Sequence, residues 1–216
     1  MDDKQFFNYL LNKTRLVFHK SSTYKKYGDK NWNFAICETP IQKRTGIFFG
    51  LNWGGDNIDV QTIYPDLQKE RNWNFVSHSR RYFRDYFNSE IEQLNYSNLC
   101  FFRSPNTHQI EHDDWALAIP LFQEYVDYIE PPWTLLLGKP EHLWHDHLSN
   151  RKTITVLDSK NNTNIHGYTG TLFGKYLFGA VPHPQAQIST EARKAIWQCV
   201  VKDNDNFEIG KISDNK

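Results

Sequence analysis

Two asparagines and one histidine stand in sequence contexts where side-chain chemistry is expected. Asn52 lies in a glycine-rich stretch, residues 50–57, after a short apolar run, and small residues there allow a backbone to turn tightly and approach a ligand. Asn98 lies inside a second apolar run, which predicts a central strand, where a polar amide needs hydrogen-bonding partners. His183 lies between two prolines. The two amides can each donate and accept hydrogen bonds, and the imidazole can also donate or take up a proton.

Each of these residues also has an ordinary structural interpretation. Asn52 could do no more than stabilise a turn, and Asp56 or Asn57 could cap the element that follows. A single histidine such as His183 is more often a surface or structural residue than a catalyst. A functional interpretation therefore depends on whether other loops of the fold carry matching residues.

The elements that position these residues alternate between strands and helices along the chain. Short apolar runs bounded by turn residues predict buried strands, and apolar residues at helical spacing predict helices. Strands that alternate with helices imply a parallel sheet covered on both faces, with ligands at the carboxyl ends of the strands. The predicted strands are residues 45–51, 96–102, 133–137 and 175–181, and the predicted helices are residues 3–19, 76–87, 112–129, 140–148 and 190–201.

The predicted fold is a single three-layer α/β/α domain over residues 1–216, with a central, mainly parallel four-stranded sheet. Residues 1–30 form its N-terminal helix and connection, and residues 203–216 form a polar tail. Pro120 predicts a kink or a later start in the helix that contains it. Residues 152–171 break the alternation, and we expect an inserted hairpin or loop there.

Composition limits the range of partners without selecting one. The 25 basic and 25 acidic residues balance, which argues mildly against a nucleic-acid partner. The 15 Phe, 11 Tyr and 7 Trp could fill a core or provide stacking surfaces for bases. A basic run with interleaved aromatic residues follows the glycine-rich stretch, although such a run is more often a solvated helix face. It contains Lys69, Arg71, Arg80, Arg81 and Arg84.

Cysteine usage and hydropathy indicate the compartment. Cys37, Cys100 and Cys199 lie far apart with no CxxC spacing, which argues against a disulfide scaffold and favours a reducing cytoplasm. The chain begins with a polar, acidic segment before any apolar run, so we expect no signal peptide. No apolar stretch approaches the about 20 residues that a membrane span needs, so we expect no membrane partner.

Five segments, taken in order, resemble the motifs of the uracil-DNA glycosylase superfamily. Gly-Leu-Asn-Trp-Gly at residues 50–54 is similar to the Gly-x-Asn-Pro-Gly motif of its mismatch-specific and single-strand-selective branches. Residues 74–76 stand where the family places an aromatic residue that stacks on the extruded base. Residues 97–106 resemble the strand with the base-reading Asn and the loop after it, and residues 133–139 resemble the third strand. Val-Pro-His-Pro-Gln-Ala at residues 181–186 resembles the His-Pro-Ser-Pro motif.

The resemblance implies a role for each residue. Cleavage of an N-glycosidic bond builds positive charge on the sugar and negative charge on the departing base, so catalysis needs a positioned water and a donor to the base. Asn52 would position the water, and His183 would donate to the base oxygen. The other implied residues are Leu51, Trp53, Phe75 and Asn98 against the base, and Gly54, Arg103, Ser104, Pro184, Gln185, Gln187 and Ile188 against DNA.

Departures from the family pattern point to an unusual substrate. Trp53 replaces the Pro of the first motif, and Gln185 with Ala186 replaces Ser-Pro in the last, which leaves Gln187 or Ile188 as the wedge into the duplex. A bulky Trp53 at the mouth of a pocket favours an enlarged or glucosylated pyrimidine, as in defence against phage with modified DNA, over DNA repair of plain uracil. No lysine stands at a catalytic loop position, so we expect a monofunctional DNA glycosylase. We also expect it to act on DNA as a monomer and without a cofactor.

Two other interpretations stay open. The first is a catalytically inert module of the same fold that binds DNA or modified bases, which the neutral charge and the altered motifs favour slightly. The second is a metallohydrolase, because His142, His145 and His147 stand with Asp146 at spacings that can hold a transition metal. A polar helix surface near DNA phosphates explains these histidines better, so we expect no metal site.

Overall fold

A computed structural model shows an α/β protein with a six-stranded mixed sheet flanked by helices. It describes residues 1–27, 33–54, 61, 63–65, 74–87 and 90–203, but not the side chains of residues 74–76 and 86–87. The strand order is β2-β1-β3-β6-β5-β4. The chain divides into two compact units: Met1–Gln68 with Asn95–Pro131, and Lys69–Leu94 with Pro132–Lys216.

Most helices and strands fall where the sequence predicts them. All four predicted strands are present, as are the helices predicted at residues 3–19, 76–87, 112–129 and 190–201, with some ends shifted. The helices are α1 Asp3–Lys20, α2 Ser22–Tyr27, α3 Asn74–Phe87, α4 His112–Ile129 and α5 Thr190–Asp203, and the 3-10 helices are η2 Ile91–Gln93, η3 Thr107–Gln109 and η4 Glu141–Leu143. The strands are β1 Ile47–Trp53, β2 Asn95–Arg103, β3 Thr134–Leu137, β4 Leu148–Asp158, β5 Thr163–Leu172 and β6 Tyr176–Val181.

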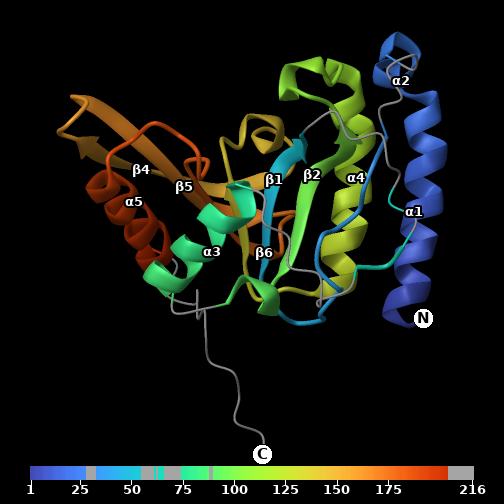
Figure 1. Cartoon of the computed structure of the whole chain (residues 1–216), viewed down its shortest axis with the longest axis horizontal. Helices are drawn as coiled ribbons and strands as arrows, with labels where there is room; N and C mark the ends of the chain where they lie inside the picture. Colours follow the sequence, from blue (N-terminus) through green and yellow to red (C-terminus); the bar gives the residue numbers. More distant parts are fainter. Residues whose placement is uncertain (28–32, 55–60, 62, 66–73, 88–89, 204–216) are drawn as a thin grey trace, which may run out of the picture. The chain divides into compact units, whose positions relative to one another are not determined.

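The first unit is built on the parallel pair β1 and β2, with α4 packed on β2 and α1 beside α4 (Figure 1). Phe49 of β1 meets Phe122 of α4 with ring centroids 4.7 Å apart, which joins strand and helix through the aromatic core. α4 starts at its predicted residue and continues through Pro120, so its start is not delayed. Pro120 and Ala116 are both exposed, and water can therefore serve the Ala116 carbonyl that proline leaves without a helical donor.

β2 lies at one end of the strand order, and its outer edge is covered. The sequence predicts a central strand around Asn98, and that prediction is wrong. Residues 33–38 run along this edge with antiparallel bridges, and the Ala35 N–H donates to the Phe101 carbonyl oxygen at 3.0 Å. Every residue of β2 is buried as a result. An apolar run predicts burial, but it does not tell whether a strand or an irregular segment covers the edge.

The second unit holds β3 and β6 as a parallel pair and adds β5 and β4 by antiparallel pairing. Of the hairpin or loop expected at residues 152–171, the structure shows a hairpin, and because it pairs with β6 the sheet has six strands instead of four. α5 covers one face of this hairpin (Figure 1), and Gly167 makes room for it, since a Cβ there would lie 2.7 Å from the Val200 side chain. Only η4 forms within the helix predicted at residues 140–148, because β4 already begins at the end of that range.

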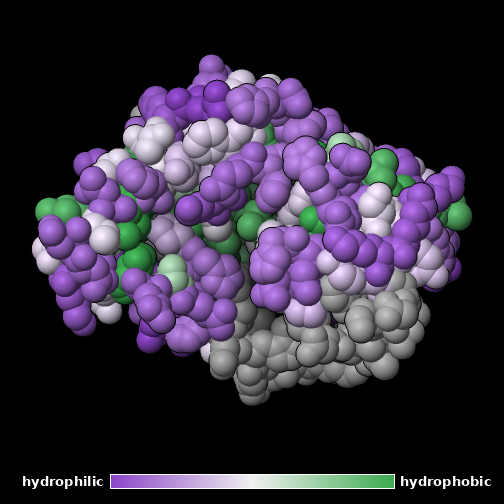
Figure 2. Space-filling model, turned by 90° about the horizontal axis from the view of Figure 1, so that it is seen from above, coloured by the Kyte–Doolittle hydropathy of each residue, from purple (hydrophilic) through white to green (hydrophobic). Residues whose placement is uncertain are grey.

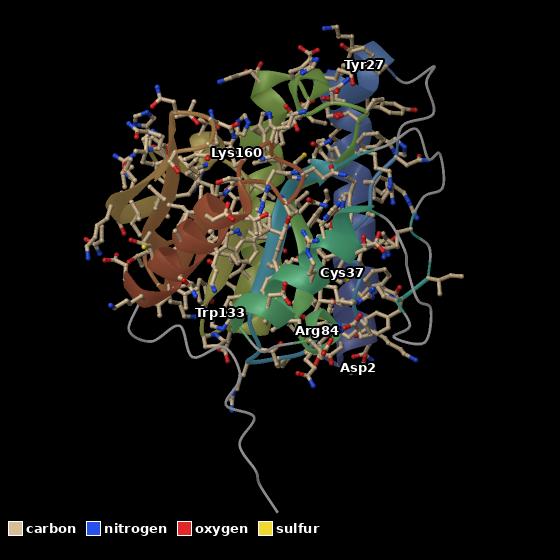
Figure 3. All side chains as sticks on the ribbon, turned by 60° about the vertical axis from the view of Figure 1, so that its left-hand side comes forward. Asp2, Tyr27, Cys37, Arg84, Trp133 and Lys160 are labelled. Atoms are coloured by element: carbon tan, nitrogen blue, oxygen red, sulfur yellow. The ribbon has the colours of Figure 1, made fainter. Side chains whose placement is uncertain are left out.

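The face of the protein seen in Figure 2 is mostly hydrophilic, with smaller hydrophobic areas between. Figure 3 labels Asp2 and Tyr27 at opposite ends of the α1–α2 segment, and the Asp2 carboxylate caps α1 by accepting the Gln5 N–H at 2.8 Å. Among the residues that the structure describes, no helix combines the length and the apolar character needed to cross a bilayer.

Candidate functional site

Asn52 lies near the end of β1 and not in the turn expected from the sequence, because the strand continues to Trp53. The pairing of β1 with β2 is irregular at this point: Asn52 faces Cys100, whereas Trp53 faces Arg103. An irregularity of this kind re-aims the side chains on either side of it. Residues 55–60, which include the two expected capping residues, lie outside the described part of the chain.

The Asn52 amide is held by the loop that follows β2. Its Nδ2 donates to the Ser104 Oγ at 2.9 Å and to the Trp53 carbonyl oxygen at 3.2 Å. Its Oδ1 accepts a hydrogen bond from the Thr107 Oγ1 at 2.9 Å. The Ser104 hydroxyl donates its own proton to the Asn106 carbonyl oxygen at 2.7 Å, so its Oγ can only accept from Asn52.

This hydroxyl network fixes which way the Asn52 amide faces. The nitrogen and oxygen of an amide are assigned from their hydrogen bonds, and the acceptor at Ser104 and the donor at Thr107 define both. An amide oxygen has two lone pairs, of which Thr107 uses one. Asn52 is half-buried, so the residue is not closed off from solvent. The amide can therefore hold a water in a fixed position, but it cannot take a proton from it.

Asn98 lies opposite Gly50 in the register of β1 and β2, and the two residues are in close contact. A Cβ at residue 50 would overlap the Asn98 Oδ1, so Gly50 serves a close approach inside a strand and not a tight turn. Asn98 is 2% exposed and also hydrogen-bonds to the Tyr96 side chain, whose pKa is raised by burial. The Asn98 amide is therefore enclosed by protein atoms.

Trp53 lies in the core, and the expectation that it stands at the mouth of a pocket is wrong. It is 2% exposed, its Nε1 donates to the Ala35 carbonyl oxygen at 2.5 Å, and its ring is tilted against Tyr96 with centroids 5.5 Å apart. The indole is buried because its N–H finds a partner there. Arg103 is buried as well, with its guanidinium carbon 5.7 Å from the Trp53 ring centroid, and so is Ser104. Leu51 is half-buried and Gly54 is exposed.

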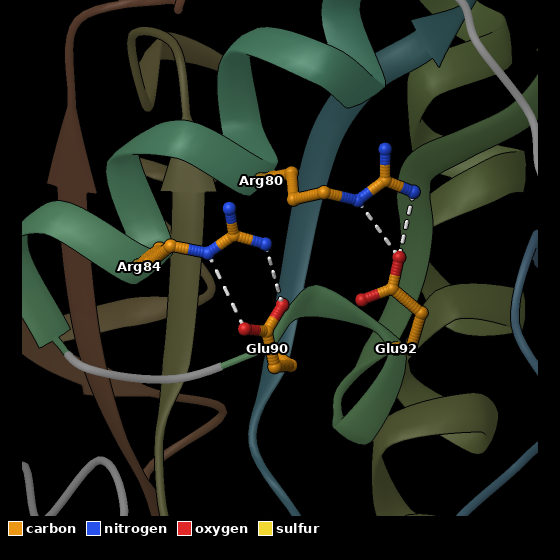
Figure 4. Close-up of polar contacts among 4 residues, drawn as sticks. All are labelled: Arg80, Arg84, Glu90 and Glu92. Atoms are coloured by element: carbon orange, nitrogen blue, oxygen red, sulfur yellow. Dashed lines mark hydrogen bonds and ion pairs between the residues drawn. The ribbon is translucent and has the colours of Figure 1, made fainter.

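The basic run is partly neutralised by carboxylates of the same unit. Arg80 donates through Nε and Nη2 to the Glu92 Oε1 at 2.9 and 2.6 Å, and Arg84 donates to both carboxylate oxygens of Glu90 at 3.3 and 3.2 Å (Figure 4). These ion pairs weaken the interpretation of the run as a DNA-binding face. Of the basic run, Lys69 and Arg71 lie outside the described part of the chain. The side chain of Phe75, the residue expected to stack on the base, also lies outside it.

In the second unit, His183 lies on the loop between β6 and α5, residues 182–189. Its Nδ1 accepts a hydrogen bond from the Gln185 N–H at 3.2 Å, so the proton of the neutral ring is on Nε2. The residue is exposed overall, but packing around the ring and the positive charge of Arg193 lower the pKa of His183 below its ordinary value. At neutral pH the ring is therefore an uncharged Nε2–H donor.

Side chains of α3 and α5 hold this loop. The Arg193 guanidinium donates to the carbonyl oxygens of His183 and Ala186 at 3.1 and 2.6 Å. The Tyr82 hydroxyl donates to the Pro184 carbonyl oxygen at 3.4 Å. The loop residues expected to contact DNA differ in exposure: Pro184 is buried, Ile188 is half-buried, and Gln185 and Gln187 are exposed.

The positioning residues that were not expected from the sequence include Thr107, Arg193 and Asp158. The Asp158 carboxylate accepts the Ser189 N–H at 3.0 Å, where the loop enters α5. One sequence pattern indicates the burial of Arg193: it shares a helix face with Trp197 four residues later, and a cation on an apolar stripe is a candidate for burial. No sequence pattern indicates Thr107 or Asp158, because polar residues are ordinary in loops and at strand ends.

Within the described part of the chain, no three His, Cys, Asp or Glu side chains are grouped so that they could hold a metal ion. Of the histidines weighed as ligands, His147 has an edge-on ring contact with Phe173, with centroids 5.8 Å apart.

No model of a protein family fits the chain, and no curated protein matches it. The family resemblance therefore depends on the five sequence segments. The geometry of the two clusters around Asn52 and His183 is independent of that resemblance.

Proposed function

We propose that the protein is a monofunctional DNA glycosylase that flips a damaged or modified pyrimidine out of DNA and hydrolyses its N-glycosidic bond. The fixed amide of Asn52 carries this proposal, because Ser104 and Thr107 orient it and leave a lone pair of its Oδ1 to hold a water. An amide does not activate water by removing its proton. The held water therefore adds to C1′ of the sugar as the bond to the base breaks, and the proton that it loses afterwards neutralises the departing base anion.

His183 supplies the second part of the proposed reaction. The departing pyrimidine takes the electron pair of the broken bond, and negative charge develops on its carbonyl oxygen. A neutral Nε2–H donor at that oxygen stabilises the charge as it forms, and the hydrogen bond from Gln185 to Nδ1 supports this role by selecting that tautomer. The reaction consumes one water and needs no cofactor.

Burial of Trp53 changes the substrate that we propose. An enlarged or glucosylated base is favoured by a Trp53 at the mouth of a pocket, and the burial of the indole removes that support. We therefore propose a flipped pyrimidine in DNA, without a preference for phage defence over DNA repair. Asn98 can read a base only after its enclosed amide leaves its contact with Gly50.

A catalytically inert module that binds DNA is the second candidate. Both ends of the Asn52 amide are engaged by protein groups, which also fits a residue that only ties β1 to the loop after β2. One assay separates the candidates: the protein is incubated with total genomic DNA and with oligonucleotides that contain uracil, mismatched thymine or glucosylated hydroxymethylcytosine. Mass spectrometry then detects any free base. A released pyrimidine supports the glycosylase, and binding without product from any of these DNAs supports the inert module.

A further inference from the structure

A buried arginine lies directly against the His183 loop. Arg193 is 5% exposed and stands on the apolar stripe of α5. Burial of a guanidinium is costly unless its N–H groups find acceptors, so its partners indicate its role. Two of these partners are main-chain oxygens of the loop: Nη1 donates to His183 and Nη2 donates to Ala186.

The two carbonyl groups belong to the ends of one turn. The Ala186 N–H donates to the His183 carbonyl oxygen at 2.8 Å and closes the turn, and the Ile188 N–H donates to the Ala186 carbonyl oxygen at 3.0 Å. Arg193 thus holds both ends of the turn with the two arms of one planar group. A planar fork fixes the distance and the angle between two acceptors, which a lysine ammonium group does not.

Further contacts hold the same loop. The Tyr82 hydroxyl reaches the Pro184 carbonyl oxygen, and the Arg193 guanidinium carbon lies 4.9 Å from the centroid of the Tyr82 ring. At the other end of the loop, Asp158 accepts the Ser189 N–H, and this hydrogen bond is the main cause that lowers the pKa of Asp158 to about 2. The loop backbone is therefore fixed by side chains from α3, α5 and β4.

The closed turn determines the tautomer of His183. The Gln185 N–H reaches Nδ1 across the turn, and an accepting Nδ1 leaves the ring proton on Nε2. We propose that Arg193 is a positioning residue that keeps this turn closed and thereby keeps the ring proton of His183 on Nε2. The clamp is a property of the free protein, and only its use in catalysis rests on the proposed function.

Nitrogen-15 NMR of the imidazole tests the clamp without any substrate. In the wild-type protein we expect the Nε2–H tautomer of His183 and a pKa below the ordinary histidine value. Arg193→Met removes the charged fork, so we expect both tautomers and a pKa closer to the ordinary value. Lys194→Met, which removes an exposed charge from the next position of α5, serves as the control and should change neither quantity. A folded Arg193→Met protein with an unchanged tautomer and pKa of His183 overturns the proposal.

Arg193→Lys keeps the test decisive if the Met variant does not fold. Lysine preserves the charge and the apolar stem but cannot hold two carbonyl groups, so the turn should open more often. We expect hydrogen exchange of the Ala186 and Ile188 N–H groups to accelerate by about tenfold, as for the loss of one hydrogen bond to a charged group. Unchanged exchange rates overturn the proposal. Neither measurement involves base release, so a protein that releases no base refutes the proposed function and leaves the clamp to be judged by NMR.

Discussion

Replacement of Gly50 by alanine should destabilise the protein through a single contact. The added Cβ would overlap the Asn98 Oδ1, and the enclosed Asn98 amide has no solvent to move into. An extra carbon in a packed interior costs about 1–3 kcal/mol. Loss of the hydrogen bond between Asn98 and Tyr96 leaves a buried polar group unsatisfied, at about 1–3 kcal/mol more. The lower chain entropy of alanine offsets about 0.5–1 kcal/mol, so we expect a net loss of about 1–5 kcal/mol.

Urea unfolding followed by circular dichroism measures this loss of free energy. In thermal unfolding, the Tm of a chain of 216 residues should fall by about 2–20 °C. Gly54→Ala is the matched control, because no atom of the described residues lies within 4 Å of a Cβ placed at Gly54. The same substitution there should change the unfolding free energy by no more than about 0.5 kcal/mol.

A double-variant cycle tests the stated cause. Asn98→Ala removes the amide that the new Cβ would strike, so Gly50→Ala should cost at least about 1 kcal/mol less in that background than in the wild type. Equal costs in the two backgrounds would show that the contact with Asn98 is not what requires glycine at residue 50.

Three other contacts have measurable effects on stability. Trp53→Phe removes the hydrogen bond to Ala35 from the core, so the free energy of unfolding in urea should fall by at least about 1 kcal/mol. A variant as stable as the wild type would contradict this role of the indole N–H. Arg84→Ala breaks an exposed ion pair with Glu90 and should change the unfolding free energy by less than about 1 kcal/mol; a larger loss would mean that the pair is structural. The folded pKa of Asp158 is about 2, below its ordinary 3.8, so its contribution is present above about pH 4 and is lost as the pH falls towards 2. Tm measured against pH should therefore fall less steeply in that window for Asp158→Asn, and equal slopes would contradict this cause.

The elements of the fold could be predicted because their signals are local. The helical spacing of apolar residues locates α4, and short apolar runs locate β1 and β2. The break in the alternation indicates the β4–β5 hairpin. Its pairing with β6, which enlarges the sheet, could not be predicted, because register between distant strands depends on partners that no short window contains.

The site was predictable only in part, for the same reason. Asn52 and His183 stand out by their flanking residues, but the hydroxyl that orients Asn52 lies 55 residues away at Thr107. The burial of Trp53 depends on an equally remote acceptor, the Ala35 carbonyl oxygen. In the sequence, a bulky aromatic residue after a motif asparagine indicates the mouth of a pocket, although in the structure its N–H forms a hydrogen bond inside the core.

We propose that Asn52 holds the water that attacks the sugar, and a measurement of base release tests this role of Asn52 most directly. Wild type, Asn52→Ala and Asn12→Ala are incubated with the same genomic DNA, free bases are quantified by mass spectrometry, and DNA binding is measured in parallel. Asn12 is the control because it is an exposed asparagine of α1. We expect a free pyrimidine from the wild type and from Asn12→Ala, and none from Asn52→Ala with binding retained. Undiminished base release by Asn52→Ala would contradict the role of Asn52, and the absence of any free base with the wild-type protein would contradict the glycosylase itself.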